Sequence, residues 1–119
     1  MRWVKVGQVF KVPVQQNWMN SHAQVPFTLV FDDFVRVFFS TRSSADKDGM
    51  LLSYSAFVDL DPSDGWKQLR LSHEPLLPLG GKGEFDEFGC MAGSIVRYQN
   101  HFLLYYCGWQ RLQSVPYNW

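Results

Sequence analysis

The stretch Asn20–Ser43, which reads NSHAQVPFTLVFDDFVRVFFSTRS, decides the fold class. Two apolar segments, Gln24–Phe31 and Phe34–Arg42, flank a short acidic turn. Runs rich in Val, Phe and Thr on both sides of a polar turn are typical of a β-hairpin. Polar side chains stand where this hairpin begins and where it ends. Binding and catalytic groups often lie where polar side chains converge on a rigid scaffold, so these ends are the first place to look for a site.

Strand signals continue along the rest of the chain. Further candidate strands are Trp3–Phe10, Met50–Asp61, Trp66–Ser72, Cys90–Tyr98 and His101–Trp109. Polar and apolar residues alternate along Trp66–Ser72, as they do in a half-exposed outer strand. No segment keeps a helical period over several turns. The sequence therefore predicts an all-β fold.

The hairpin pattern occurs twice in the chain. When Val37–Arg42 is superposed on Leu104–Trp109, the two hairpin turns also coincide. The first unit, residues 21–75, adds two further strands, whereas the second, residues 90–110, ends after its hairpin. A four-stranded unit that recurs at this spacing is typical of a β-propeller blade. We therefore expect antiparallel blades, about two in number, within a single domain over residues 1–119, and strand 3–10 as an outer strand used in ring closure.

Composition excludes several classes of protein. The formal net charge is +0, from 11 basic and 11 acidic residues, so no basic face for nucleic acid is expected. No apolar run is long enough to span a membrane, and the start of the chain does not resemble a signal peptide. A cytoplasmic protein is expected. The two cysteines, Cys90 and Cys107, are expected to be buried free thiols, with a cross-strand disulfide as the alternative.

Four segments in succession, SHAQVP, RVFFSTR, GEFDEFGCMAGSIV and FLLYYCGW, resemble glycosidase-like five-bladed β-propellers. This superfamily contains arabinanases, fructosidases and mannoside phosphorylases. The likeness covers nearly the whole chain but only the N-terminal part of such a protein. It implies a partial propeller module, which ends about where a third blade would begin, and it leaves open whether the chain is a truncated form.

The resemblance also implies where catalytic groups would lie. In these enzymes carboxylates on successive blades cleave the glycosidic bond, one as an acid and one as a base or nucleophile. Asp86 in GEFDEFG resembles the middle-blade carboxylate. The first-blade position holds no carboxylate, and His22 stands there as a possible base, because the pKa of histidine suits that role. The late acid would lie beyond Trp119, so the catalytic set is incomplete.

Five residues are candidates for binding sugar, each with a structural alternative. His22 and Gln24 would face the same side of a strand and could bind hydroxyl groups or satisfy backbone groups. Arg42 could reach the pocket rim or form a surface ion pair. Trp18 and Trp109 could stack on sugar rings or belong to the core, and Tyr106 is expected in the core. The histidines and cysteines lack the spacing of a zinc site, so neither a metal nor a cofactor is expected.

Three functions fit this sequence. The first is a carbohydrate-related protein, a glycoside hydrolase-like propeller module that binds an oligosaccharide. The second is a self-assembling structural or interaction domain, because a partial propeller leaves strand edges and apolar faces that a homo-oligomer would cover. The third is an enzyme whose active site is completed by residues from another subunit.

Overall fold

A computed structural model describes residues 2–14 and 17–111. All six strands lie in one mixed sheet, and the described residues include no helix. The strands are β1 (Ser21–Val30), β2 (Val35–Arg42), β3 (Ser53–Asp61), β4 (Lys67–Leu71), β5 (Gly89–Tyr98) and β6 (His101–Trp109). The all-β prediction is confirmed. The last residues of the domain expected over 1–119 lie outside the described residues.

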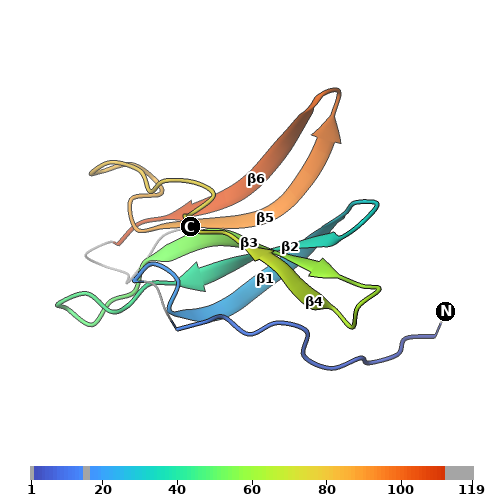
Figure 1. Ribbon diagram of the computed structural model, residues 1–119. Coiled ribbons are helices and arrows are strands. Elements are labelled where there is room, and N and C mark those ends of the chain that lie inside the picture. The colour runs from blue at the N-terminus through green and yellow to red at the C-terminus, as the bar shows by residue number, and fades with distance from the viewer. Residues whose placement is uncertain (1, 15–16, 112–119) are drawn as a thin grey trace.

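The first four strands form an antiparallel meander, in which each strand pairs with the next along the chain. A long connection then leads to the antiparallel hairpin β5–β6. The hairpin joins the meander through a single parallel bridge between Ser53 and Gly89. In Figure 1 the tip of this hairpin rises away from the meander, so the two units meet mainly where β3 and β5 begin.

The expected strand at 3–10 is wrong, because residues 2–14 form no strand. Trp3, Val4 and Val6 are 87%, 72% and 71% exposed, whereas Phe10 and Val12, later in the segment, pack in the core. Figure 1 shows the segment running beside the sheet as an extended chain. Alternating apolar residues favour an extended backbone, but a strand also needs a partner edge, and none pairs with this segment in the described part of the chain.

One face of the meander carries the hydrophobic core. Phe39 of β2 lies opposite Ala56 of β3, and Val37 lies opposite Val58. The period of two along a strand places these side chains on one face, where Phe10 and Val12 of the N-terminal segment pack against them. Phe39, Ala56 and Val58 are each 1% exposed or less. The N-terminal segment is therefore part of the core although it is not part of the sheet.

The edge strand β1 is irregular in its first half. Its pairing with β2 shifts register between Ser21 and Gln24, and again between Gln24 and Phe27. His22 and Val25 have φ values of 64° and 49°, a region that residues with a side chain seldom occupy. Two such irregularities in succession are β-bulges, which often lie beside functional sites and re-aim side chains.

Candidate functional site

Strand register brings the ends of five strands into one row. Ser21 pairs with Arg42, Arg42 with Ser53, Ser53 with Gly89, and Gly89 with Trp109. We call these five residues the end row. Arg42 and Trp109, two of the residues predicted for the site, belong to the row itself. His22 directly follows Ser21 in sequence, and Asp86 lies three residues before Gly89.

Ser53 is the centre of the end row. Its Oγ accepts a hydrogen bond from the indole Nε1 of Trp109 at 2.9 Å and another from the guanidinium of Arg42. The Arg42 Cζ lies 6.0 Å from the centre of the Trp109 ring. Burial lowers the pKa of Arg42, because the charged form loses hydration. Ser53 was not predicted for the site, since a serine at the start of a strand carries no distinctive signal in sequence.

Trp109 is 5% exposed, so its ring packs inside the structure rather than facing solvent. Trp18 makes an edge-on contact with Tyr54, at 6.0 Å between ring centres, and packs against the core. The surroundings of both tryptophans therefore fit the core position that was the alternative to stacking on sugar. Arg42 contacts Ser53 and Trp109. Asp46, one of the partners considered for an Arg42 ion pair, instead pairs with Arg111 at 3.1 Å.

Asp86 is a buried acidic residue, only 7% exposed. Its Oδ2 accepts hydrogen bonds from the hydroxyl of Tyr106 at 2.9 Å and from the thiol of Cys90 at 3.6 Å. Two glycines leave room for it, because a Cβ on Gly80 would lie 2.1 Å from Asp86 Oδ1 and one on Gly108 would lie 2.6 Å from Asp86 Cβ. Side chains at either glycine would displace this carboxyl group.

The Asp86 cluster also sets the proton affinity of its neighbours. Burial, and then the nearby Asp86, raise the pKa of the Cys90 thiol to about 12, so this sulfur is not a nucleophile near neutral pH. The hydrogen bond to Asp86 raises the pKa of Tyr106. Tyr106 is 37% exposed, so the expectation that it lies in the core is wrong. Its position in an apolar strand favoured the core, but the Tyr106 side chain is exposed and its hydroxyl donates a hydrogen bond to Asp86.

His22 and Gln24 are both exposed on β1. The Nδ1 of His22 lies 2.8 Å from Ser21 Oγ, within hydrogen-bond distance. The expectation that the two side chains share a face assumed a regular strand, and the positive φ at His22 removes that basis. Gln24 pairs across the sheet with Ser40, whose side chain is buried and whose Oγ has no hydrogen-bond partner in the described structure. An unsatisfied buried hydroxyl is uncommon in folded proteins.

The curvature of the sheet brings its first and fourth paired strands together. Three strand pairings separate Ser21 from Gly89 along the end row. Nevertheless, some Cα atoms of β1 and β5 lie within 8 Å of each other, which a flat sheet would not allow. The strands that carry His22 and lead away from Asp86 are therefore neighbours in space as well as members of one row.

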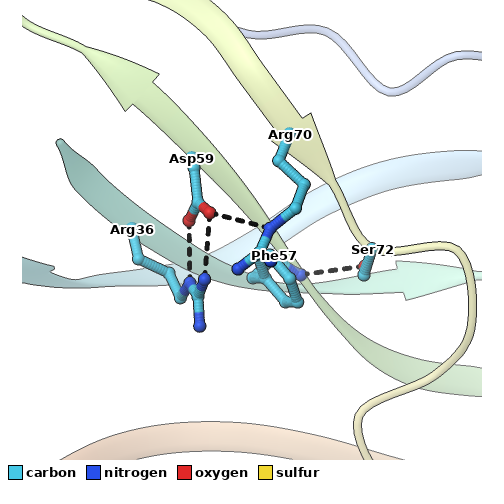
Figure 2. A network of polar contacts seen from close by, with 5 residues as sticks. All are labelled: Arg36, Phe57, Asp59, Arg70 and Ser72. Atoms are coloured by element: carbon cyan, nitrogen blue, oxygen red, sulfur yellow. Dashed lines mark hydrogen bonds and ion pairs between the residues drawn. The ribbon is translucent and has the colours of Figure 1, made fainter.

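A second polar cluster lies near the other end of β3. Asp59 accepts two hydrogen bonds from Arg36, at 2.7 and 2.9 Å, and one from Arg70 at 3.1 Å. Figure 2 shows the ring of Phe57 beside the two arginines, whose Cζ atoms lie 4.0 and 5.1 Å from the ring centre. The side chain of Asp59 is 5% exposed and its charge is met by both cations. This cluster joins β2, β3 and β4, and we assign it to stability.

Two features were sought in the part of the chain that the structure describes and are absent there. It contains no group of three or more His, Cys, Asp or Glu residues arranged to hold a metal ion. Nor does it contain a helix of the length and apolar character needed to cross a bilayer. Both cysteines are free thiols, but the expectation that both are buried is wrong for Cys107, which is exposed. Its partner across the hairpin is Met91, whereas Cys90 lies opposite Gly108.

Comparison with known proteins finds two relatives, both from Mycobacterium tuberculosis. They are uncharacterized protein MT1551 of strain CDC 1551 / Oshkosh and uncharacterized protein Rv1502 of strain ATCC 25618 / H37Rv. Each is 37% identical over 118 residues, which are 98% of this chain. The chain spans 38% of the length of these relatives. No protein-family model and no solved structure matches it.

Proposed function

We propose that this chain is part of a glycosidase-like five-bladed β-propeller and that its end row lies beside an oligosaccharide-binding pocket. The observation that carries the proposal is the register of the end row, because it gathers candidates from distant parts of the sequence at one end of the sheet. The location that we propose for the protein is the cytoplasm.

The strand order supports the assignment to a propeller. A blade is a four-stranded antiparallel sheet, and β1 to β4 pair in that consecutive order. A new hairpin follows, and among the described residues its strand pairing with the meander is limited to Ser53 and Gly89. Under this assignment β1 and β5 are the innermost strands of neighbouring blades, and their first residues lie at the mouth of the central channel. Figure 1 is consistent with this arrangement, since the two hairpins diverge from that end.

The side chains support binding more than complete hydrolysis. His22 and Gln24 are exposed polar groups on a strained strand, and the Tyr106 hydroxyl is exposed and held by Asp86. Such groups can donate to and accept from sugar hydroxyls. We propose that Tyr106 contacts the ligand and that Asp86, which is buried, positions it. The resemblance puts the late acid outside the described residues, so catalysis would need residues that the described part of the chain does not supply.

The test is calorimetric titration of the chain with a panel of oligosaccharides. We expect saturable binding, and we expect Gln24→Ala or Tyr106→Phe to weaken it about tenfold, which corresponds to about 1.4 kcal/mol. Gln68→Ala is the matched control, because Gln68 is an exposed polar residue on β4, away from the end row. The proposal fails if no oligosaccharide binds, or if the control weakens binding as much as the site variants do.

A self-assembling domain is the second candidate, and a specific observation favours it. Several large apolar side chains of the β5–β6 hairpin are exposed, among them Tyr98 at 57%, Phe102 at 48% and Tyr105 at 59%. Contiguous exposed apolar residues are typical of interaction surfaces. This function does not require sugar binding, and the two can occur in one protein.

A further inference from the structure

Arg42 is a half-buried cation in the end row, and most of its hydrogen-bond donors are unused. A guanidinium has several N–H donors, and in the described structure Arg42 donates one hydrogen bond, from Nη1 to Ser53 Oγ. The Arg42 Cζ also lies 6.0 Å from the centre of the Trp109 ring. Neither contact supplies a negative charge. Burial lowers the pKa of Arg42, because the charged form loses hydration that these contacts do not fully replace.

The other half-buried arginines of the described chain each have an acidic partner. Arg36 forms an ion pair with Asp59 at 2.7 Å, and Arg111 forms one with Asp46 at 3.1 Å. Among the described residues, no carboxylate lies within ion-pair distance of Arg42. A partly buried charge without a counter-ion is unfavourable, and an anion that reaches it restores the lost interaction. Arg42 is therefore a candidate for binding an anion.

The acidic residue of the predicted site does not present its charge to solvent. Asp86 is 7% exposed, and its Oδ2 accepts a hydrogen bond from the hydroxyl of the more exposed Tyr106. The carboxylates of Glu84 and Glu87, in the loop before β5, accept hydrogen bonds from backbone N–H groups of the same loop. Among the end row and the predicted site residues, no carboxylate is exposed. An anion at Arg42 would therefore meet no exposed like charge from these residues.

We propose that Arg42 binds the carboxylate of an acidic sugar, so that the oligosaccharide recognised at the end row contains a uronic acid. This inference rests on the proposed sugar binding and names the class of sugar. A planar guanidinium matches a carboxylate through two parallel N–H···O bonds. One arginine neutralises the single charge of a carboxylate, whereas a phosphate monoester carries about −1.5 to −2 charges at pH 7 and would leave part of its charge unmatched.

The neighbours of Arg42 hold it in place and lie beside further polar groups. Ser53 is 0% exposed and accepts hydrogen bonds from both Arg42 and Trp109, so the guanidinium is attached to a buried group. A side chain that is already held loses less conformational entropy when a ligand binds. On the other side Arg42 pairs with Ser21 of β1, about 5 Å away, and the exposed His22 follows Ser21. Hydroxyl groups of the same sugar could therefore contact β1.

The test is calorimetric titration of the chain with matched pairs of oligosaccharides, each a uronic acid oligomer and its neutral counterpart of the same length and linkage. For one pair or more we expect the acidic member to bind about ten- to a hundredfold more tightly, the range of a hydrogen bond to a charged group. Arg42→Gln should remove this difference and leave the affinity for the neutral member unchanged. Arg97→Gln is the matched control, because it removes the same charge from an exposed residue of β5 that pairs with Phe102, away from the end row. This variant should keep the difference.

The outcomes separate this inference from the proposed function. If the neutral member of every pair binds as tightly as the acidic one, the inference fails and the proposed sugar binding stands. If no oligosaccharide binds, both fail. An equal loss of both affinities in Arg42→Gln would show that Arg42 only maintains the structure, and tighter binding of the corresponding sugar phosphate would overturn the choice of a carboxylate. Arg42→Lys keeps the charge without the planar fork and should retain a smaller difference, which tests the inference even if Arg42→Gln does not fold.

Discussion

The meander β1–β4 and the hairpin β5–β6 begin with the same pattern but differ in burial. In the meander, the N-terminal segment covers one face and β3 covers the edge of β2. In the hairpin, Ile95 and Leu104 are half-buried, and much of the apolar surface beyond them is open. Similar strand propensity can therefore yield a core strand or an exposed one. The difference lies in which neighbours each hairpin has.

The largest difference in stability between the two units should appear when a phenylalanine of each is replaced. Phe39→Ala removes a ring that is 1% exposed and leaves a cavity, so we expect the free energy of unfolding to fall by about 3–5 kcal/mol. Phe102→Ala removes a ring that is 48% exposed and should cost about 1 kcal/mol or less. Urea denaturation of both variants, at one protein concentration, measures the difference. Equal losses would mean that the hairpin is as well packed as the meander.

The buried acidic residues should give the next largest difference. Asp59→Ala leaves Arg36, which is 19% exposed, without its partner, so we expect a loss of about 3 kcal/mol. Asp86→Ala leaves two neutral donors, one of them on the accessible Tyr106, and should cost about 1–2 kcal/mol.

Thermal unfolding followed by circular dichroism compares these two variants. Asp64→Ala, which breaks the exposed pair with Lys67, is the control and should change stability by less than about 0.5 kcal/mol. A larger loss for Asp86→Ala than for Asp59→Ala would contradict the role that we give to the two arginines.

The smallest effect on stability at neutral pH concerns the Cys90 thiol, whose contribution changes only at alkaline pH. The pKa of Cys90 is raised from 9.0 to about 12 in the folded chain, so the folded state keeps a proton that the unfolded state loses. This contribution to stability is complete below pH 9.0 and is lost as the pH rises through about 12. Cys90→Ala should flatten the alkaline decline in stability, as measured by urea denaturation across that range.

A thiol reagent tests directly whether the two cysteines differ in accessibility. Cys107 is exposed and should react quickly in the folded protein, whereas Cys90 is buried and should react only on unfolding. Fast modification of both thiols in the folded protein would show that the environment of Cys90 is open.

The extent to which the site could be predicted varies from residue to residue. Asp86 was predicted because its segment resembles a propeller motif, and Arg42 because it is a polar residue at the end of an apolar strand. Ser53 and Tyr106 were missed or assigned to the core, because their roles depend on hydrogen bonds to residues far along the chain. For Trp109, sequence left sugar stacking and core packing open, and the structure describes a buried ring.

The sequence by itself determined the strands, since alternation, β-branched and aromatic residues and short polar turns act locally. Six of the seven predicted strands are present, within a few residues of their expected bounds. Only the tertiary structure decided that residues 2–14 pack without pairing, that β1 is bulged, and that the end row exists. The physical reason is that pairing, register and burial depend on contacts between residues distant in sequence, and no local pattern records them.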